Sequence, residues 1–204
     1  MERASFIFTI FFLLLGPIKI IPAFQRLTHQ SGSEFKREAA FKASLIASAL
    51  VGIVAVFGEG LAAKYSISLD AVRIAGGLVL LLSALKLMFP SAEPSSSGAS
   101  KPTALQIAIS PLATPIIVPP AGIAAVLIFV MMAPQYPGSG LVIALGLATM
   151  MVLDFLVMFF ADDFVKLPGL LVLLQVFGSA LIFIQLALAI EVLLGALRSI
   201  GDAS

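Results

Sequence analysis

The sequence predicts an all-α membrane protein with six transmembrane helices, arranged as two inverted three-helix repeats in which helices 1 and 4 are broken. Three observations lead to this prediction. Hydrophobic residues make up 60% of the 204-residue chain and charged residues 11%, whereas an ordinary soluble domain has about 25% charged residues. Six apolar stretches are long enough to cross a bilayer, which takes about 20 residues. Two proline-containing segments, 16–23 and 114–121, align without a gap.

The six apolar stretches are separated by polar segments. Gly, Ala and Ser recur within them, which lets neighbouring helices approach closely. The polar segment 25–40 between the first two stretches is expected to be a loop in which a helix begins at Ser33, with Ser33 as its N-cap. The predicted spans are residues 4–24, 41–63, 69–89, 103–133, 140–161 and 168–197.

A segment rich in Ser, Pro and Gly divides the chain into two halves. Residues 91–102 have the composition of a flexible linker, and three predicted spans lie on either side, in residues 1–90 and 103–204. Because three is an odd number, the second half enters the membrane from the opposite side, which gives an inverted repeat. Loops rich in Lys and Arg are expected on the cytoplasmic side. This rule places the linker inside and both termini outside the plasma membrane, the inner membrane of a prokaryote.

The aligned prolines are the main pointer to function. Pro17 aligns with Pro115, and Pro22 with Pro120; each removes a backbone donor and clashes with the preceding helical turn. A broken helix at membrane depth is tolerated only where the freed backbone groups face protein or a wet cavity. Such breaks at corresponding places in two halves indicate the binding site of a transporter, although prolines can also simply kink a helix. The predicted substrate-binding residues are Gly16, Pro17, Lys19, Pro22, Ser110, Thr114, Pro115, Pro119 and Pro120.

Three segments, residues 14–28, 67–77 and 107–117, resemble the signatures of the MarC family of six-span membrane proteins, in order and in spacing. The resemblance implies a secondary transporter of the LysE-like superfamily of small amino-acid exporters, some of whose members are associated with small neutral amino acids. The chain departs from the family pattern at both breaks. It has Gly-Pro-Ile-Lys at 16–19 where relatives usually carry Asn-Pro-x-Gly, and Val-Pro-Pro-Ala-Gly at 118–122 where they usually carry Gly-Pro-Gly.

Lys19 and Asp154 are charged residues deep within predicted spans. The first and fifth spans run in the same direction, and the two residues lie at comparable distances into them, so we expect them to approach each other or to share one aqueous vestibule. A charge within a span usually has a partner or a function. Alternatively, Lys19 snorkels to the headgroups near Arg26 or lines the cavity and attracts an anionic group. The alternative for Asp154 is a protonated carboxyl bonded to a neighbouring helix.

Three further charged residues are candidates for coupling or ion pairing. Asp70 and Arg73 lie three residues apart, on one helical face, and form either a helix-start ion pair or part of the coupling machinery. Arg73 lies within the second MarC-like segment and ranks above its neighbours. Glu59 follows a long uncharged run, and either carries a coupling proton or is an interfacial glutamate close to Lys64.

The remaining composition excludes several classes of function. The chain has no cysteine, a single histidine (His29, in a polar loop) and a net charge of +1, and it shows no motif of a nucleotide, metal or catalytic site. We therefore expect no enzyme, cofactor, metal or nucleic-acid partner. The expected partners are the lipid bilayer, a small-molecule substrate and protons, and the sequence is also compatible with a homo-oligomer.

The resulting hypothesis is a secondary transporter of the plasma membrane. It moves a small polar metabolite, a small amino acid or related carboxylate, and it is coupled to protons through a buried carboxylate. Two other classes remain open at this point. One is a passive channel for small solutes, and the other is a non-transporting membrane sensor or assembly protein.

Overall fold

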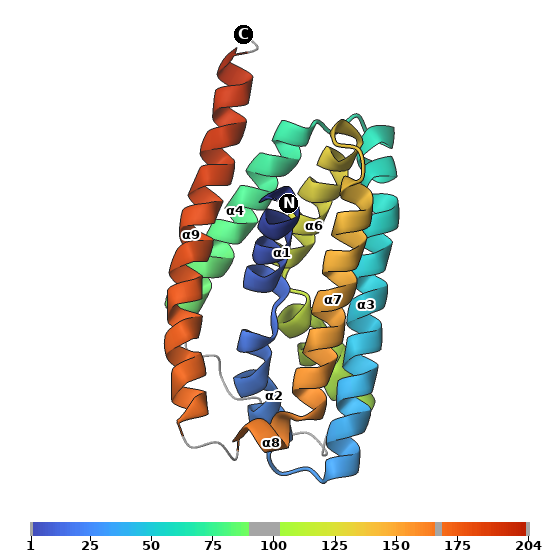
Figure 1. The fold of residues 1–204 in the computed structure, drawn as a ribbon, viewed down its shortest axis with the longest axis vertical. Coiled ribbons are helices and arrows are strands. Elements are labelled where there is room, and N and C mark those ends of the chain that lie inside the picture. Colours follow the sequence, from blue (N-terminus) through green and yellow to red (C-terminus); the bar gives the residue numbers. More distant parts are fainter. Residues whose placement is uncertain (1, 90–102, 166–168, 203–204) are drawn as a thin grey trace.

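The structure, a computed structural model, describes residues 2–89, 103–165 and 169–202, and in these residues it is helical with no β-strand (Figure 1). Five helices are long and apolar enough to cross a membrane, and a sixth span results if the bent pair Ala104–Ile117 and Pro120–Gln135 is counted as one. The prediction of an all-α protein is confirmed, with five or six candidate spans against the six predicted. The inverted relation of the halves stays a prediction.

The first half follows the predicted order of spans, with two differences at the first connection. Helix α3 begins at Ser33, but its N-cap is Gly32, which makes no side-chain cap. The loop predicted at 25–40 shrinks to a short turn because α2 continues to Thr28 and α3 has already begun. The elements are α1 (Glu2–Leu15), η1 (Pro17–Lys19), α2 (Ile20–Thr28), α3 (Ser33–Lys64) and α4 (Leu69–Met88).

The second half is more irregular at its start. Thr103 and Gln106 form a capping box at the first helix, in which each side chain accepts a hydrogen bond from the other residue's backbone N–H. The predicted linker, 91–102, lies outside the described residues. The elements are α5 (Ala104–Ile107), η2 (Ala108–Ile117), α6 (Pro120–Met132), η3 (Ala133–Gln135), α7 (Ser139–Phe159), α8 (Ala161–Val165) and α9 (Leu170–Asp202).

The two ends of the bundle differ in which connections they hold. The start of α1, the end of α9, and the α3–α4 and α6–α7 connections lie toward the upper end in Figure 1; we call this the terminal end. The α2–α3 connection and α8 lie at the other end, called here the opposite end. Helices α3 and α7 run antiparallel between the two ends, and α1 runs in the same direction as α7.

Two buried clusters hold the helices together. The larger one joins α1, α2, α3, η2, α6 and α7, and the smaller one joins α1, α4, α6 and α9. Helix α3 contributes alanines with no exposed surface, including Ala40, Ala43 and Ala47, which let its backbone come close to η2 and α7. The outward faces carry exposed large apolar side chains such as Val56 and Leu141, as expected where a helix faces lipid.

Candidate functional site

The first predicted break is present. Helix α1 ends at Leu15, Gly16 is extended (φ −76°, ψ 163°), and Pro17 opens the single 3-10 turn that leads into α2. A Cβ added to Gly16 would lie 2.0 Å from the carbonyl oxygen of Phe12, so this close approach requires glycine. Pro22 does not break the chain, because it lies in the first turn of α2, where its missing N–H is not needed.

The second predicted break is also present and is more extensive. Within η2, Ser110 (φ −142°, ψ 126°) and Thr114 (φ −141°, ψ 129°) are extended rather than helical, as expected for residues that precede proline. Thr114 is followed by Pro115 and occupies the position that aligns with Gly16, so the equivalent residue is extended before a proline in both halves.

The chain changes direction again before α6. Pro119 is extended and Pro120 is the first residue of α6, where a proline needs no hydrogen-bonded N–H. Across this point the axis bends by 59°. The second half therefore contains more irregular backbone than the first, most of it between α5 and α6.

The two breaks lie close together in the interior. Leu15, the last residue of α1, packs against Gly122 in the first turn of α6, where an added Cβ would be 2.4 Å from Leu15 Cδ2. Segment η1 also contacts α7 and α9, and α2 contacts η2. Ile20, Ala113 and Val118, which flank the breaks, have 0–1% of their surface exposed. In contrast, the extended residues Ser110 and Thr114 of the second break are exposed, so the breaks combine buried and exposed backbone.

Lys19 is held by a residue that the sequence analysis did not identify. Its Nζ donates a hydrogen bond of 3.0 Å to Oε1 of Gln185 on α9, and Nε2 of Gln185 donates to the backbone oxygen of Leu80 on α4 at 3.3 Å. Gln185 is only 1% exposed. No ion pair joins Lys19 to Asp154 in the described part of the chain, and the approach of the two residues stays a prediction. Lys19 does not snorkel toward Arg26 either, because its hydrogen bond points to a buried amide.

Asp154 lies on α7 with 0% of its surface exposed, and neither of its carboxylate oxygens has a hydrogen-bond partner among the described residues. The alternative of a carboxyl bonded to a neighbouring helix is therefore wrong as well. Helix α1 packs on α7 near these residues, and the ring of Phe11 lies 3.2 Å from a Cβ added to Gly146. Lys19 and Asp154 are each eight residues further along (19 − 11 and 154 − 146). The shared vestibule stays a prediction.

A second buried polar side chain without a partner lies on the neighbouring helix. Ser44 of α3 is 8% exposed, and its Oγ has no hydrogen-bond partner in the described part of the chain. The sequence offered a weak signal for Gln185, one of two glutamines within the last apolar span, but none for Ser44, because serines are common in these helices.

Asp70 and Arg73, at the start of α4, form a helix-start ion pair, which is one of the two roles that the sequence left open for them. Arg73 Nη1 donates to Oδ1 of Asp70 at 3.1 Å. Ser199 Oγ donates to Oδ2 of Asp70 at 3.0 Å, and Arg73 Nη2 lies 3.7 Å from the sulfur of Met132. These contacts join α4 to α9 and α6 at the terminal end. Glu59 is exposed on α3, without an ion pair among the described residues, so it does not lie with Asp154 in the interior.

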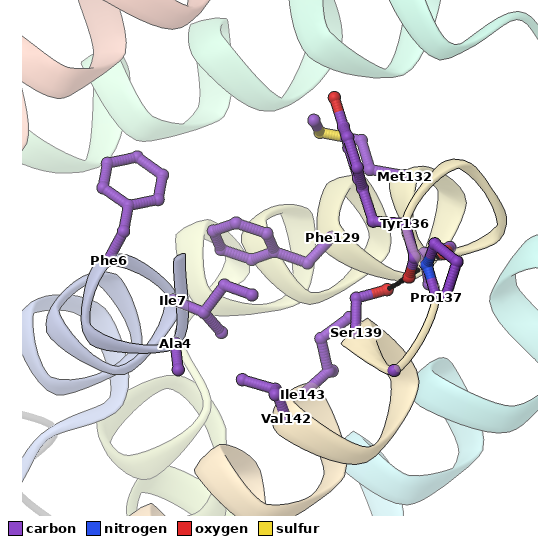
Figure 2. Close-up of a pocket in the computed structure, with 12 residues that line it drawn as sticks. Ala4, Phe6, Ile7, Phe129, Met132, Tyr136, Pro137, Ser139, Val142 and Ile143 are labelled. Atoms are coloured by element: carbon purple, nitrogen blue, oxygen red, sulfur yellow. Dashed lines mark hydrogen bonds between the residues drawn. The ribbon is translucent and has the colours of Figure 1, made fainter. Parts of the chain in front are cut away.

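A cavity of about 480 Å³ opens at the terminal end between α1, α6 and α7 (Figure 2). Phe6 and Ile7 from α1 face Phe129 of α6 across it. Its walls are mostly apolar, and the Oγ of Ser139 is within 2.9 Å of a carbonyl oxygen of its own loop. Below Ile7, the buried ring of Phe11 meets the ring of Phe129 edge to face at a centroid distance of 5.4 Å. This aromatic contact separates the cavity from the first break. The cavity is therefore not the pocket that the sequence predicts between the two breaks.

Comparisons with known proteins agree with this architecture. The family model described as "MarC family integral membrane protein" matches residues 2–200. The UPF0056 inner membrane protein YhgN of Escherichia coli K12 is 34% identical over 139 residues, which is 67% of this chain and 68% of that protein. A UPF0056 membrane protein of Methanocaldococcus jannaschii is 28% identical over 196 residues, which is 93% and 95% of the two chains. No solved structure matches. This chain, with its broken first and fourth spans, belongs to the MarC family of integral membrane proteins.

Proposed function

We propose that the protein is a secondary transporter that moves a small polar metabolite, a small amino acid or related carboxylate, across the plasma membrane. The observation that carries the proposal is the contact between Leu15 and Gly122, which brings the breaks of the two halves together in the interior. Unwound backbone at membrane depth offers N–H and C=O groups to a polar solute that lipid cannot accommodate.

The pairing of helices supports two halves related by inversion. Span 3 packs against span 6 (α4 on α9), and span 2 packs against span 5 (α3 on α7). The contact of α1 with α7 (spans 1 and 5) corresponds to that of α6 with α3 (spans 4 and 2). The contact of α6 with α4 (spans 4 and 3) corresponds to that of α1 with α9 (spans 1 and 6). A pseudo-twofold axis would produce each of these equivalences. In transporters with inverted repeats the two halves move against each other around a fixed site. The proposed orientation of this chain has both termini on the outside.

The polar groups near the breaks suit a carboxylate-bearing solute. The ammonium of Lys19 has three donors, and Gln185 takes one of them. The other donors remain for a carboxylate, to which a charge-assisted hydrogen bond contributes about 1.5–3 kcal/mol. Gln185 thereby fixes the direction in which Lys19 presents its charge.

Asp154 is the group that we assign to proton coupling. It is the carboxylate of the described spans with no exposed surface and no partner. An ionised carboxylate in this setting is very unfavourable, so its charge has to be compensated by a proton or a cation whenever the site is sealed. Glu59, which is exposed, is not part of this proposal.

The direct test is transport by the purified protein in sealed proteoliposomes. Small neutral amino acids and short carboxylates are tested for uptake and for counterflow against an unlabelled internal pool. We expect saturable uptake with counterflow, and a KM raised by roughly 10–100-fold in Lys19→Gln, as loss of a charge-assisted bond implies. Lys64→Gln, on the exposed end of α3, is the matched control. Uptake without counterflow indicates a channel. A lack of specific uptake over the whole panel contradicts the transporter and favours a sensor or assembly role.

A further inference from the structure

The buried carboxylate of Asp154 and the buried hydroxyl of Ser44 are the two groups in the described core whose polar atoms have no partner. Leaving a buried polar group unsatisfied costs about 1–3 kcal/mol, and more if it is charged. Two such groups on adjacent helices are unfavourable unless something binds between them. Neither group is used by the ion pairs and hydrogen bonds that join the helices.

The two groups lie at nearly the same level of the bundle. In the antiparallel pair α3 and α7, the ring of Phe41 meets that of Phe155 at 6.3 Å, and Arg37 lies over the ring of Phe159 at 4.9 Å. Ser44 is three residues beyond Phe41, and Asp154 is one residue from Phe155 in the same direction. The difference is two residues, or about 3 Å along the axes at 1.5 Å per residue. Both side chains are buried at this level, although they do not hydrogen-bond to each other.

We infer that Asp154 and Ser44 form a site for one monovalent cation, an alkali metal ion or the primary ammonium of a solute, which replaces the proton on Asp154. A carboxylate and a hydroxyl supply one negative charge and neutral oxygen, the ligands that hard cations prefer. Helix α3, which carries Ser44, packs directly against α7, which carries Asp154.

The charges around the site limit the ion to a single charge. Among the described residues there is no group of three or more His, Cys, Asp or Glu that would hold a divalent metal. Lys19 is bonded to Gln185, and Lys42 is exposed and pairs with Glu38. The titratable and charged groups described on the elements packed against α7 are Lys19, Arg26, Glu34, Lys36, Arg37, Glu38, Lys42, Glu59, Lys64, Asp162 and Asp163.

The exchange balances in atoms and charge. A protonated Asp154 releases its proton to solution, and the cation takes its place on the carboxylate, so that the site stays neutral in both states. This deepens the proposed function, since it names what exchanges with the coupling proton. The binding itself is measured without transport.

The first experiment uses the wild-type protein in detergent. The probes are NaCl and methylammonium chloride, with choline chloride holding the ionic strength constant. We expect the thermal unfolding temperature to rise with one of the two probes at pH 8, and the half-saturating concentration to increase about tenfold for each pH unit lower while the proton occupies Asp154. In weakly buffered solution near neutral pH, the same probe should release up to one proton per protein. Saturable stabilisation by Na⁺ identifies an alkali ion, and by methylammonium an ammonium.

The second experiment compares variants with matched controls. Asp154→Asn should abolish the cation-dependent stabilisation, and Ser44→Ala should weaken it by roughly 3–10-fold, the equivalent of one hydrogen bond. Glu59→Gln and Ser179→Ala remove an exposed carboxylate and an exposed hydroxyl, and should leave the cation-dependent stabilisation unchanged. The inference is overturned if neither probe stabilises the wild type and no proton is released, or if Asp154→Asn keeps the full response. Cation binding without any transport rejects the proposed function alone, whereas transport without cation binding rejects this inference alone.

Discussion

Lys19 and Asp154 lie on segments that pack together and run in the same direction, and yet no ion pair joins them in the described part of the chain. Lys19 is bonded to Gln185 at 3.0 Å, while Asp154 is fully buried without a hydrogen-bond partner in the residues that the structure describes. Two opposite charges that are kept apart in the interior can each serve a bound species, whereas a closed ion pair would satisfy both.

Replacing Gln185 tests this arrangement directly. Gln185→Leu removes the acceptor of Lys19 and the bond to the Leu80 carbonyl, so we expect a loss of about 1–3 kcal/mol in stability and weaker substrate binding. Gln175→Leu, an exposed glutamine on the same helix, is the control. Thermal unfolding and the transport KM are the measurements. A Gln185→Leu protein with unchanged values would show that this hydrogen bond is unimportant.

The contact of the two breaks should be sensitive to side-chain volume. Gly122→Ala places a Cβ 2.4 Å from Leu15 Cδ2, and overpacking of this kind costs about 1–3 kcal/mol. Leu15→Ala in the same protein should restore part of the loss, because it removes the clashing group. Gly140→Ala is the control, since nothing lies within 4 Å of a Cβ there. Additive effects in the double mutant, measured by unfolding, would contradict the contact.

The aromatic contact beneath the cavity should limit access from the terminal end. Because the chain has no cysteine, single cysteines can be labelled selectively. Ser139→Cys lines the cavity and should react readily with a membrane-impermeant thiol reagent, whereas Met150→Cys, fully buried on the same helix, should react at least about tenfold more slowly, as buried thiols do. Adding Phe11→Ala should speed the labelling of Met150→Cys. Equal rates in all three proteins would mean that Phe11 does not close this route.

Proton coupling predicts a loss of pH response in one variant. Wild-type transport should depend on the pH gradient, and Asp154→Asn, which carries no titratable carboxyl, should catalyse exchange that is independent of pH between 5 and 8. Rates in proteoliposomes with imposed gradients measure this. Glu59→Gln should behave as the wild type does, and an unaltered pH response in Asp154→Asn would remove Asp154 from the coupling.

The pair at the start of α4 should matter for stability rather than for transport. Asp70→Asn weakens the bonds from Arg73 and Ser199, both near the end of the bundle, and partly exposed ion pairs contribute about 0.2–1 kcal/mol. We expect a small decrease in unfolding temperature and an unchanged KM. A large rise in KM would instead place Asp70 in the transport path.

Much of this architecture can be read from local properties of the sequence. Apolar length fixes the spans, because a lipid environment excludes unsatisfied backbone. Proline chemistry fixes the breaks at Gly16 and Thr114, because each precedes a proline that removes a donor and pushes the residue before it into an extended conformation. The prediction that Lys19 and Asp154 share a level also follows from span direction and the rise per residue alone.

The partners of the charged groups could not be obtained in this way. Whether Lys19 meets Asp154 or Gln185 depends on how α9 packs beside η1 and α4, which involves residues more than 160 positions apart in the chain (185 − 19 = 166). The same holds for Ser44, whose isolation arises from the register of α3 on α7. The contact of Leu15 with Gly122 likewise requires two helices to meet with a glycine at the crossing point.

The sequence by itself determined that this chain crosses a membrane and unwinds at two corresponding places, because hydropathy and proline sterics act over a few neighbouring residues. Only the tertiary structure decided that the two unwound places touch, that Lys19 is bonded to α9 and that Asp154 is left without a partner. These outcomes depend on the rotation and register of whole helices, which are set by the close packing of small residues between them.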